Sequence, residues 1–120
     1  MTVEEKLDII LKSCESKKGF DTKVLDIGGM TSIADYFVIV SGNSSAQVDA
    51  LAREIDEKLS DEGEEPLNTE GKNSSRWIIL DFGDIIVHVF HKDEREYYNL
   101  ERLWEDNENN KNKKENEEED

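Results

Sequence analysis

The chain has 120 residues, with 30 acidic and 15 basic side chains and a formal net charge of −15. This charge repels phosphate backbones and excludes charge-driven binding of nucleic acid, whereas it suits either a basic protein partner or solubility alone. The length fits one domain, no apolar run approaches the about 18 residues of a membrane helix, and the acidic start is not that of a signal peptide.

The first predicted element is a helix over residues 2–18. Thr2 and Glu5 have the spacing of a capping box, in which each side chain accepts a hydrogen bond from the other residue's backbone amide. Gly19 is expected to end the helix in a left-handed conformation. Cys14 is the single cysteine, and it is interpreted as a buried apolar residue in a reducing compartment, because no base lies near it in sequence. The apolar face of this helix comprises Val3, Leu7, Ile10, Leu11 and Cys14.

Two strands and a second helix follow. Residues 24–27 form a short predicted strand, and residues 35–41 form a longer one whose nearly continuous apolar run indicates a central strand covered on both faces. Ser44, with Gln47 three residues later, is predicted to cap the second helix, and Gly63 to end it. The inner face of this helix comprises Val48, Leu51, Ala52, Ile55 and Leu59.

A β-hairpin dominates the next part of the chain. A weak strand at 67–70 precedes residues 76–91, where two β-rich stretches flank a Gly/Asp turn at 81–84. Asp93 and Glu96 have capping-box spacing and predict a final helical turn. The order of elements predicts an α/β single domain, with a mixed five-stranded sheet and flanking helices.

The last stretch differs in composition from the rest. Residues 105–120 contain eight acids, three lysines and no apolar side chain. Such a segment buries nothing, so we expect a domain over 1–104 and a disordered acidic tail over 105–120. The tail is either functional or only a solvated end.

The turn at 41–45 lies between a predicted buried strand and a helix start. Free backbone amides at such a turn could hold a phosphate, but the segment has neither the lysine of a P-loop nor the glycine triplet of a dinucleotide site. The alternative is a structural turn in which Gly42 permits the bend and Ser44 caps the helix.

Two pairs of residues suggest metal or acid–base chemistry. Asp81 and Asp84 flank the hairpin tip, where they could bind a cation or simply accept hydrogen bonds from backbone amides of the turn. His88 and His91 are three apart on one strand, so they point to opposite faces and do not share a metal. His88 lies among apolar residues and is interpreted as a hydrogen-bonded structural histidine, with a general base as the alternative.

Large aromatic side chains concentrate in the C-terminal half: Trp77, Tyr97, Tyr98 and Trp104. Trp and Tyr dominate binding hot spots because they bury much area at low entropic cost. The alternative is that they belong to the domain core. Trp77 alternates with Ile78 along a strand, so one set of helices does not cover both side chains.

Over residues 1–104 the sequence resembles the ribosomal silencing factor (Iojap-like) family. The motifs that carry the resemblance are Asp35–Ile39 with Ser41–Ser44, Trp77 with Leu80–Asp84, Val87–Phe90, and Arg95–Trp104. The resemblance implies a cytoplasmic protein with a nucleotidyltransferase-like fold, homodimeric when free. It also implies binding to the large ribosomal subunit through large-subunit ribosomal protein fourteen, which sterically blocks joining of the small subunit and represses translation under nutrient limitation.

The resemblance also suggests an interface. Trp77 and Tyr98 would be its desolvated anchors, and Asp81 and Glu101 would meet basic side chains of the partner, mainly setting orientation and encounter rate. The partner-binding residues implied in this way are Trp77, Asp81, Tyr97, Tyr98, Leu100 and Glu101.

The alternative hypothesis is a metal-dependent nucleotidyltransferase-like enzyme that holds phosphate at the 42–44 turn. Active members of that fold class carry an acid-x-acid pair on a following strand. Here the strand at 67–70 lacks such a pair, and Glu54 and Asp56 have the spacing but fall on a helix, where their side chains diverge. Because two-metal transfer chemistry needs the pair, we expect no catalysis, no metal site and no cofactor.

Overall fold

The computed structural model describes residues 1–98, and the predicted tail at 105–120 lies outside the described residues. The elements occur in the predicted order. They are α1 (Val3–Ser16), β1 (Phe20–Asp26), β2 (Tyr36–Gly42), α2 (Ser45–Ser60), β3 (Asn68–Glu70), β4 (Trp77–Asp81), β5 (Ile85–His91) and α3 (Lys92–Tyr98).

The five strands form one mixed sheet in the order β1-β2-β5-β4-β3, which confirms the predicted fold class. β2 and β5 run parallel, and the other neighbours are antiparallel. β5 is the middle strand, and all of its residues are buried. β2 is also buried from Phe37 onward, as its apolar run predicts.

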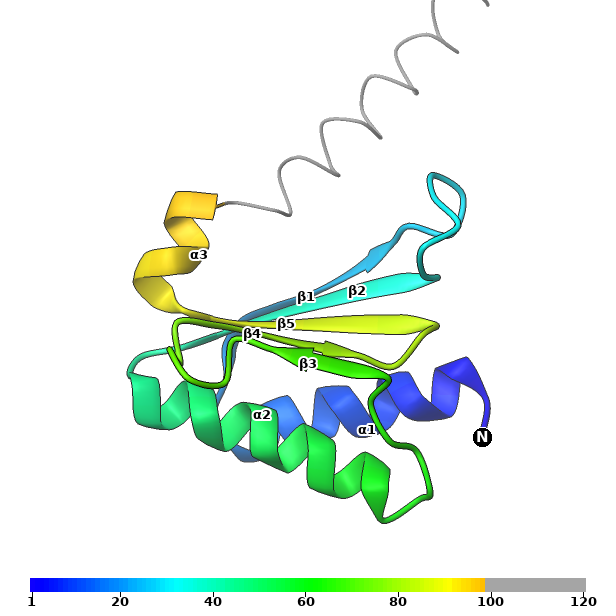
Figure 1. The fold of residues 1–120 in the computed structure, drawn as a ribbon, viewed down its shortest axis with the longest axis horizontal. Coiled ribbons are helices and arrows are strands. Elements are labelled where there is room, and N and C mark those ends of the chain that lie inside the picture. Colours follow the sequence, from blue (N-terminus) through cyan, green and yellow to red (C-terminus); the bar gives the residue numbers. More distant parts are fainter. Residues whose placement is uncertain (99–120) are drawn as a thin grey trace, which may run out of the picture.

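Both long helices lie on the same side of the sheet, below it in Figure 1, and this side is called the helix side. Strand residues that alternate toward α1 and α2 are aliphatic and almost inaccessible. They pack against the predicted inner faces of the two helices, which confirms those faces. The strand residues of this core are Val38, Val40, Ile78, Leu80, Ile85, Val87 and Val89.

The helix caps follow the sequence closely. Thr2 Oγ1 accepts from the Glu5 amide at 3.1 Å, and Glu5 Oε1 accepts from the Thr2 amide at 3.2 Å, so the predicted capping box is present. Ser44 Oγ accepts from the Gln47 amide at 3.1 Å. Gly63 follows α2 with φ +81°, the left-handed conformation expected after a helix.

The predicted role of Gly19 as a left-handed residue is wrong. Lys18 takes the positive φ, 59°, whereas Gly19 is needed for space. A Cβ on Gly19 would lie 2.5 Å from Val40 Cγ2 and 2.9 Å from Leu51 Cδ2. The glycine therefore lets the chain pass directly over the core between α1 and β1.

Two boundaries also differ from the prediction. β1 begins at Phe20 rather than Val24, because a bulge between Phe20 and Lys23 interrupts the polar–apolar alternation while pairing with β2 continues. The capping box predicted at Asp93 is wrong, since α3 already starts at Lys92 and the Asp93 amide donates to His91 Nδ1 at 3.2 Å. Among residues 1–98, no helix is both long and apolar enough to cross a membrane.

Candidate functional site

The side of the sheet opposite α1 and α2, called here the aromatic side, has a different composition from the helix side. Among the described residues, the 27–35 loop packs on it near the hairpin tip, and α3 contacts it at the other end (Figure 1). Strand register places three rows across this side. The rows contain Ser41, Phe90 and Trp77, then Ile39, His88 and Ile79, then Phe37, Ile86 and Asp81.

Trp77 is half-buried on this side and is held by two neighbours. Its ring stacks on Phe90, with centroids 4.9 Å apart and an interplanar angle of 25°. Its Nε1–H donates to His88 Nδ1 at 3.1 Å. The sequence left open whether Trp77 is core or surface. The structure keeps it out of the helix-side core and fixes its orientation.

His88 is a buried histidine with a defined protonation state. Because Nδ1 accepts from Trp77, the proton of the neutral ring lies on Nε2. Burial lowers the pKa of His88 to about 4, so the ring is neutral at pH 7. Nε2 is buried and has no hydrogen-bond partner among residues 1–98. The predicted hydrogen bonding of His88 and its place among apolar residues are confirmed.

The carboxylates of the two hairpin aspartates have different partners. Asp81 Oδ1 accepts from the Gly83 amide at 2.8 Å, while Gly83 has φ +91°. Asp84 Oδ2 accepts from Lys6 Nζ at 3.0 Å, and its backbone carbonyl accepts from the amides of Asp35 and Tyr36. The interpretation as a side chain that accepts from a turn amide is confirmed for Asp81. It is wrong for Asp84, whose carboxylate pairs with Lys6 instead.

Lys6 is a buried cation that the sequence interpretation missed. Its ammonium lies 3.0 Å from Asp84 and 3.4 Å from Glu64, and the hydrogen bond to Asp84 is the main reason that its pKa is raised. One signal was available, because Lys6 lies three residues after Val3 and four before Ile10, within the apolar face of α1.

Backbone and side-chain groups of the turn at 41–45 take part in the N-terminal cap of α2. Gln47 Oε1 accepts from the Asn43 amide at 2.6 Å, and Gln47 Nε2 donates to the carbonyls of Lys17 and Lys18. Ser41 Oγ accepts from Arg95 Nη1 at 2.9 Å. These contacts support the structural alternative, since the side chains of the turn tie α1, α2 and α3 to the end of β2.

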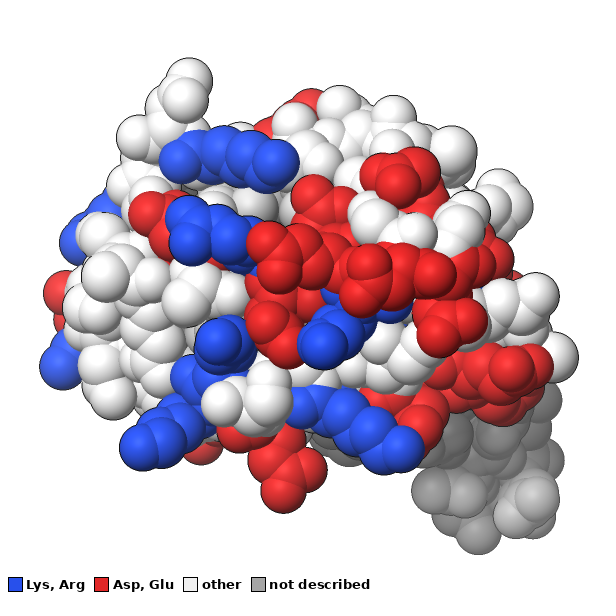
Figure 2. Space-filling view, turned by 90° about the horizontal axis from the view of Figure 1, so that it is seen from below, with Lys and Arg blue, Asp and Glu red and all other residues white. Residues whose placement is uncertain are grey.

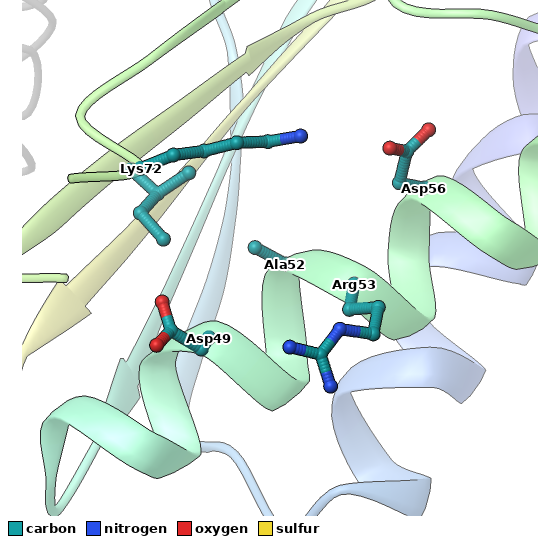
Figure 3. A pocket seen from close by; sticks show the side chains of 6 residues that line it. Asp49, Ala52, Arg53, Asp56 and Lys72 are labelled. Carbon is teal, nitrogen blue, oxygen red and sulfur yellow. The ribbon is translucent and has the colours of Figure 1, made fainter.

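A cavity of about 300 Å³ lies on the helix side, between α2 and the loop before β4. Figure 3 shows Lys72 reaching across it while Asp49, Arg53 and Asp56 come from α2. Asp49 accepts from Ser75 Oγ at 2.6 Å. The lining of the cavity contains two acids and two bases, whose formal charges cancel. The complete lining is Asp49, Ala52, Arg53, Asp56, Lys72 and Ile78.

The side chains of Glu54 and Asp56 diverge, as expected for residues two apart on a helix. Glu54 faces Lys17 and Lys58, each at 3.9 Å, whereas Asp56 lines the cavity. Within residues 1–98 no group of three His, Cys, Asp or Glu side chains could hold a metal ion. Cys14 is buried, and desolvation raises the pKa of its thiol to about 12, as suits a core residue.

Charge is distributed unevenly over the molecule. Four segments meet at the hairpin-tip end, where Lys6 joins Asp84 and Glu64, and the Leu67 amide donates to Asp81. These segments, 1–6, 26–35, 61–67 and 81–84, hold ten acidic residues and one lysine. Figure 2 shows the helix side, where red acidic side chains gather in one broad area and blue ones lie mostly outside it.

Of the six interface residues implied by the resemblance, Trp77 and Asp81 share the aromatic side. Tyr97 and Tyr98 belong to α3, which contacts β2 and β5, and only their backbone is described. Leu100, Glu101 and also Trp104 lie outside the described residues.

Sequence reasoning missed the bond between His88 and Trp77. The hairpin register pairs Trp77 with Phe90, which makes His88 a diagonal neighbour within reach of a large ring.

Comparison with known proteins gives consistent results. Residues 1–120 match the family model "Ribosomal silencing factor during starvation". The Ribosomal silencing factor RsfS of Bacillus subtilis is 48% identical over 100 residues, which cover 83% of this chain and 85% of that protein. The chloroplastic protein Iojap of Zea mays is 32% identical over 98 residues, covering 79% of this chain and 41% of that protein.

A solved structure has the same fold. The crystal structure of a protein from Chromobacterium violaceum superposes with a TM-score of 0.84 at 35% identity and covers 87% of both chains. The nucleotidyltransferase-like character of the fold stays a prediction. The sequence matches and the shared fold cover the helices, the sheet and the hairpin described above, and this chain belongs to the ribosomal silencing factor family.

Proposed function

We propose that this protein binds the large ribosomal subunit through large-subunit ribosomal protein fourteen and, by occupying the contact surface, blocks joining of the small subunit. Translation would then be repressed when nutrients are scarce. The mechanism needs affinity and bulk but no catalysis, so the proposal assigns no reaction, no metal and no cofactor to the chain. We further propose that the protein is cytoplasmic and that it forms a homodimer when it is not bound to the ribosome.

The observation that carries the proposal is the placement of Trp77. A large aromatic ring is half-buried on the aromatic side of the sheet, stacked on Phe90 and hydrogen-bonded to His88. A pre-oriented ring loses little rotamer entropy when a partner covers it, and this favours a central role in binding.

Electrostatics supports a basic partner such as a ribosomal protein. The hairpin-tip end is strongly acidic, and Asp81 connects that end to the aromatic side, because its carboxylate stands on the same side of β4 as Trp77. Opposite charges raise the encounter rate and fix orientation, and salt weakens both effects. Asp81 gives one oxygen to the Gly83 amide, so we propose that it contributes orientation more than affinity.

The remaining interface residues come from the family resemblance. Tyr97 and Tyr98 belong to α3, which contacts β5 beside the row of Trp77. We propose that Tyr98 is the second anchor and that Tyr97, Leu100 and Glu101 extend the contact. α3 follows β5 without a linker, so Tyr97 and Tyr98 belong to an element joined directly to the middle strand of the sheet.

The first test is sedimentation of the purified protein with separated large and small ribosomal subunits, at low and moderate salt. We expect co-migration with the large subunit alone, together with reduced joining of added small subunits. If the protein stays in the supernatant at both salt concentrations, the proposal is wrong. Mg²⁺ and nucleotides would then be tested as ligands by their effect on the melting temperature.

The second test substitutes the anchor. Trp77→Ala is expected to weaken binding to the large subunit by about 2 kcal/mol or more. Tyr36→Ala is the matched control, since Tyr36 is a half-buried aromatic residue that packs on the helix-side core. The control is expected to lose stability and keep its affinity, and equal binding losses in both variants would remove Trp77 from the interface.

A further inference from the structure

The sequence suggests a structural role for His88, but the structure places this residue next to Trp77 on the proposed binding surface. It stands in the middle strand and in the middle row of the aromatic side, between Ile39 of β2 and Ile79 of β4. Its Nδ1 receives the indole N–H of Trp77 at 3.1 Å. We infer that His88 is the positioning residue that holds the Trp77 ring in the orientation met by the partner, an inference that rests on the proposed function.

The imidazole is itself held in place by rings. Phe37 meets it edge-on, with centroids 4.8 Å apart and an angle of 67°, and Phe90 lies nearly parallel to it at 6.2 Å. Trp77 stacks on the same Phe90. The acceptor atom for the indole therefore has a fixed direction, and the indole is restrained both by its face and by its N–H.

Packing alone does not account for a histidine at this position. Its Nε2–H is buried and has no partner among residues 1–98, and a buried donor without an acceptor lowers stability. A leucine of similar size would fill the site without that polar group. Within the described part of the chain, the bond to Trp77 is the single hydrogen bond of the His88 ring.

Two substitutions separate positioning from packing. His88→Leu keeps an apolar side chain of similar volume and removes the acceptor. His88→Asn places an amide oxygen close to the location of Nδ1 and so restores an acceptor for the indole. Ile86→Val is the control, because Ile86 lies on the same side of β5 but pairs with Asp81, two rows away from the row of Trp77.

The experiment measures three properties of each full-length variant. They are the affinity for purified large ribosomal subunits, the melting temperature, and the NMR signals of the tryptophan indole N–H groups. The chain has two tryptophans, so a Trp104→Phe variant identifies the Trp77 signal. For His88→Leu we expect an unchanged or higher melting temperature, a displaced Trp77 signal and an affinity about tenfold lower. His88→Asn should return the signal toward its original position and recover part of the affinity, while Ile86→Val should bind normally.

Each other outcome overturns a specific statement. If Trp77→Ala weakens binding and His88→Leu does not, the positioning role is wrong and the proposed function stands. If affinity and melting temperature fall together in both His88 variants, the role is structural and the inference is likewise wrong. A wild-type chain that does not bind large subunits overturns the proposed function, and the inference with it.

Discussion

The two sides of the sheet are built from the same strands but differ in what their residues do. On the helix side, residues such as Leu80 and Val87 are inaccessible and belong to one apolar core. On the aromatic side, Trp77 and Ile79 are half-buried, and the contacts include a side-chain hydrogen bond and stacked rings. Apolar packing without polar groups contributes stability, whereas a restrained and partly accessible aromatic ring is suited to binding.

The largest expected contrast comes from adjacent residues of β4. Leu80→Ala empties a fully buried position of the helix-side core and should lower the free energy of unfolding by about 2–5 kcal/mol. Ile79→Ala, on the half-buried aromatic side, should lower it by clearly less. Urea denaturation followed by circular dichroism measures both values. Equal losses would show that the two sides contribute alike to stability.

The second prediction uses the buried histidine as a probe of the aromatic side. The folded protein has a His88 pKa of about 4, below the ordinary value of 6.5 that we take for the unfolded chain. The unfolded state therefore binds more protons between these values, and stability that is fully present above pH 6.5 is lost as the pH falls toward 4. The loss attributable to His88 is as much as about 3 kcal/mol.

Many carboxylates titrate in the same range, so the measurement is a comparison. Unfolding free energies of the wild type and of His88→Leu are determined from pH 7 to pH 4.5. We expect the wild type to lose stability relative to the variant as the pH falls, because only the wild type must keep a buried neutral imidazole. Parallel pH curves for the two proteins would contradict the burial of His88.

Local sequence patterns were sufficient for the order of the elements. Thr2 and Ser44 mark helix starts through their side chains, and the apolar residues that the spacing places inward in α1 and α2 pack in the helix-side core. The hairpin followed from a Gly/Asp turn between β-rich stretches, and its register also fixes the diagonal relation of Trp77 to His88. These features depend on neighbours close in sequence.

The side of the sheet that α1 and α2 cover was not predictable in the same way. β4 alternates Trp77 and Ile79 with Ile78 and Leu80, so both faces are apolar and a period of two does not distinguish them. The parallel pairing of β2 with β5, and the central position of β5, depend on a crossover through α2, β3 and β4. The pairing of Lys6 with Asp84 joins residues 78 positions apart and was missed for the same reason.

The smallest expected effect tests how closely the helix side is packed. Gly19→Ala would bring a methyl group to 2.5 Å from Val40 Cγ2 and 2.9 Å from Leu51 Cδ2, so core side chains must shift. Overpacking of this kind costs about 1–3 kcal/mol of unfolding free energy. Gly29→Ala is the control, because a Cβ there meets nothing within 4 Å. Thermal unfolding of both variants should show a loss only at Gly19.

Binding to the large subunit should be unchanged in both, since a change at Gly19 alters the helix side and leaves the Trp77–His88 pair intact. A Gly19→Ala variant that folds stably but no longer binds would show that the two sides of the sheet are coupled, and that the division between a stabilising side and a binding side is wrong.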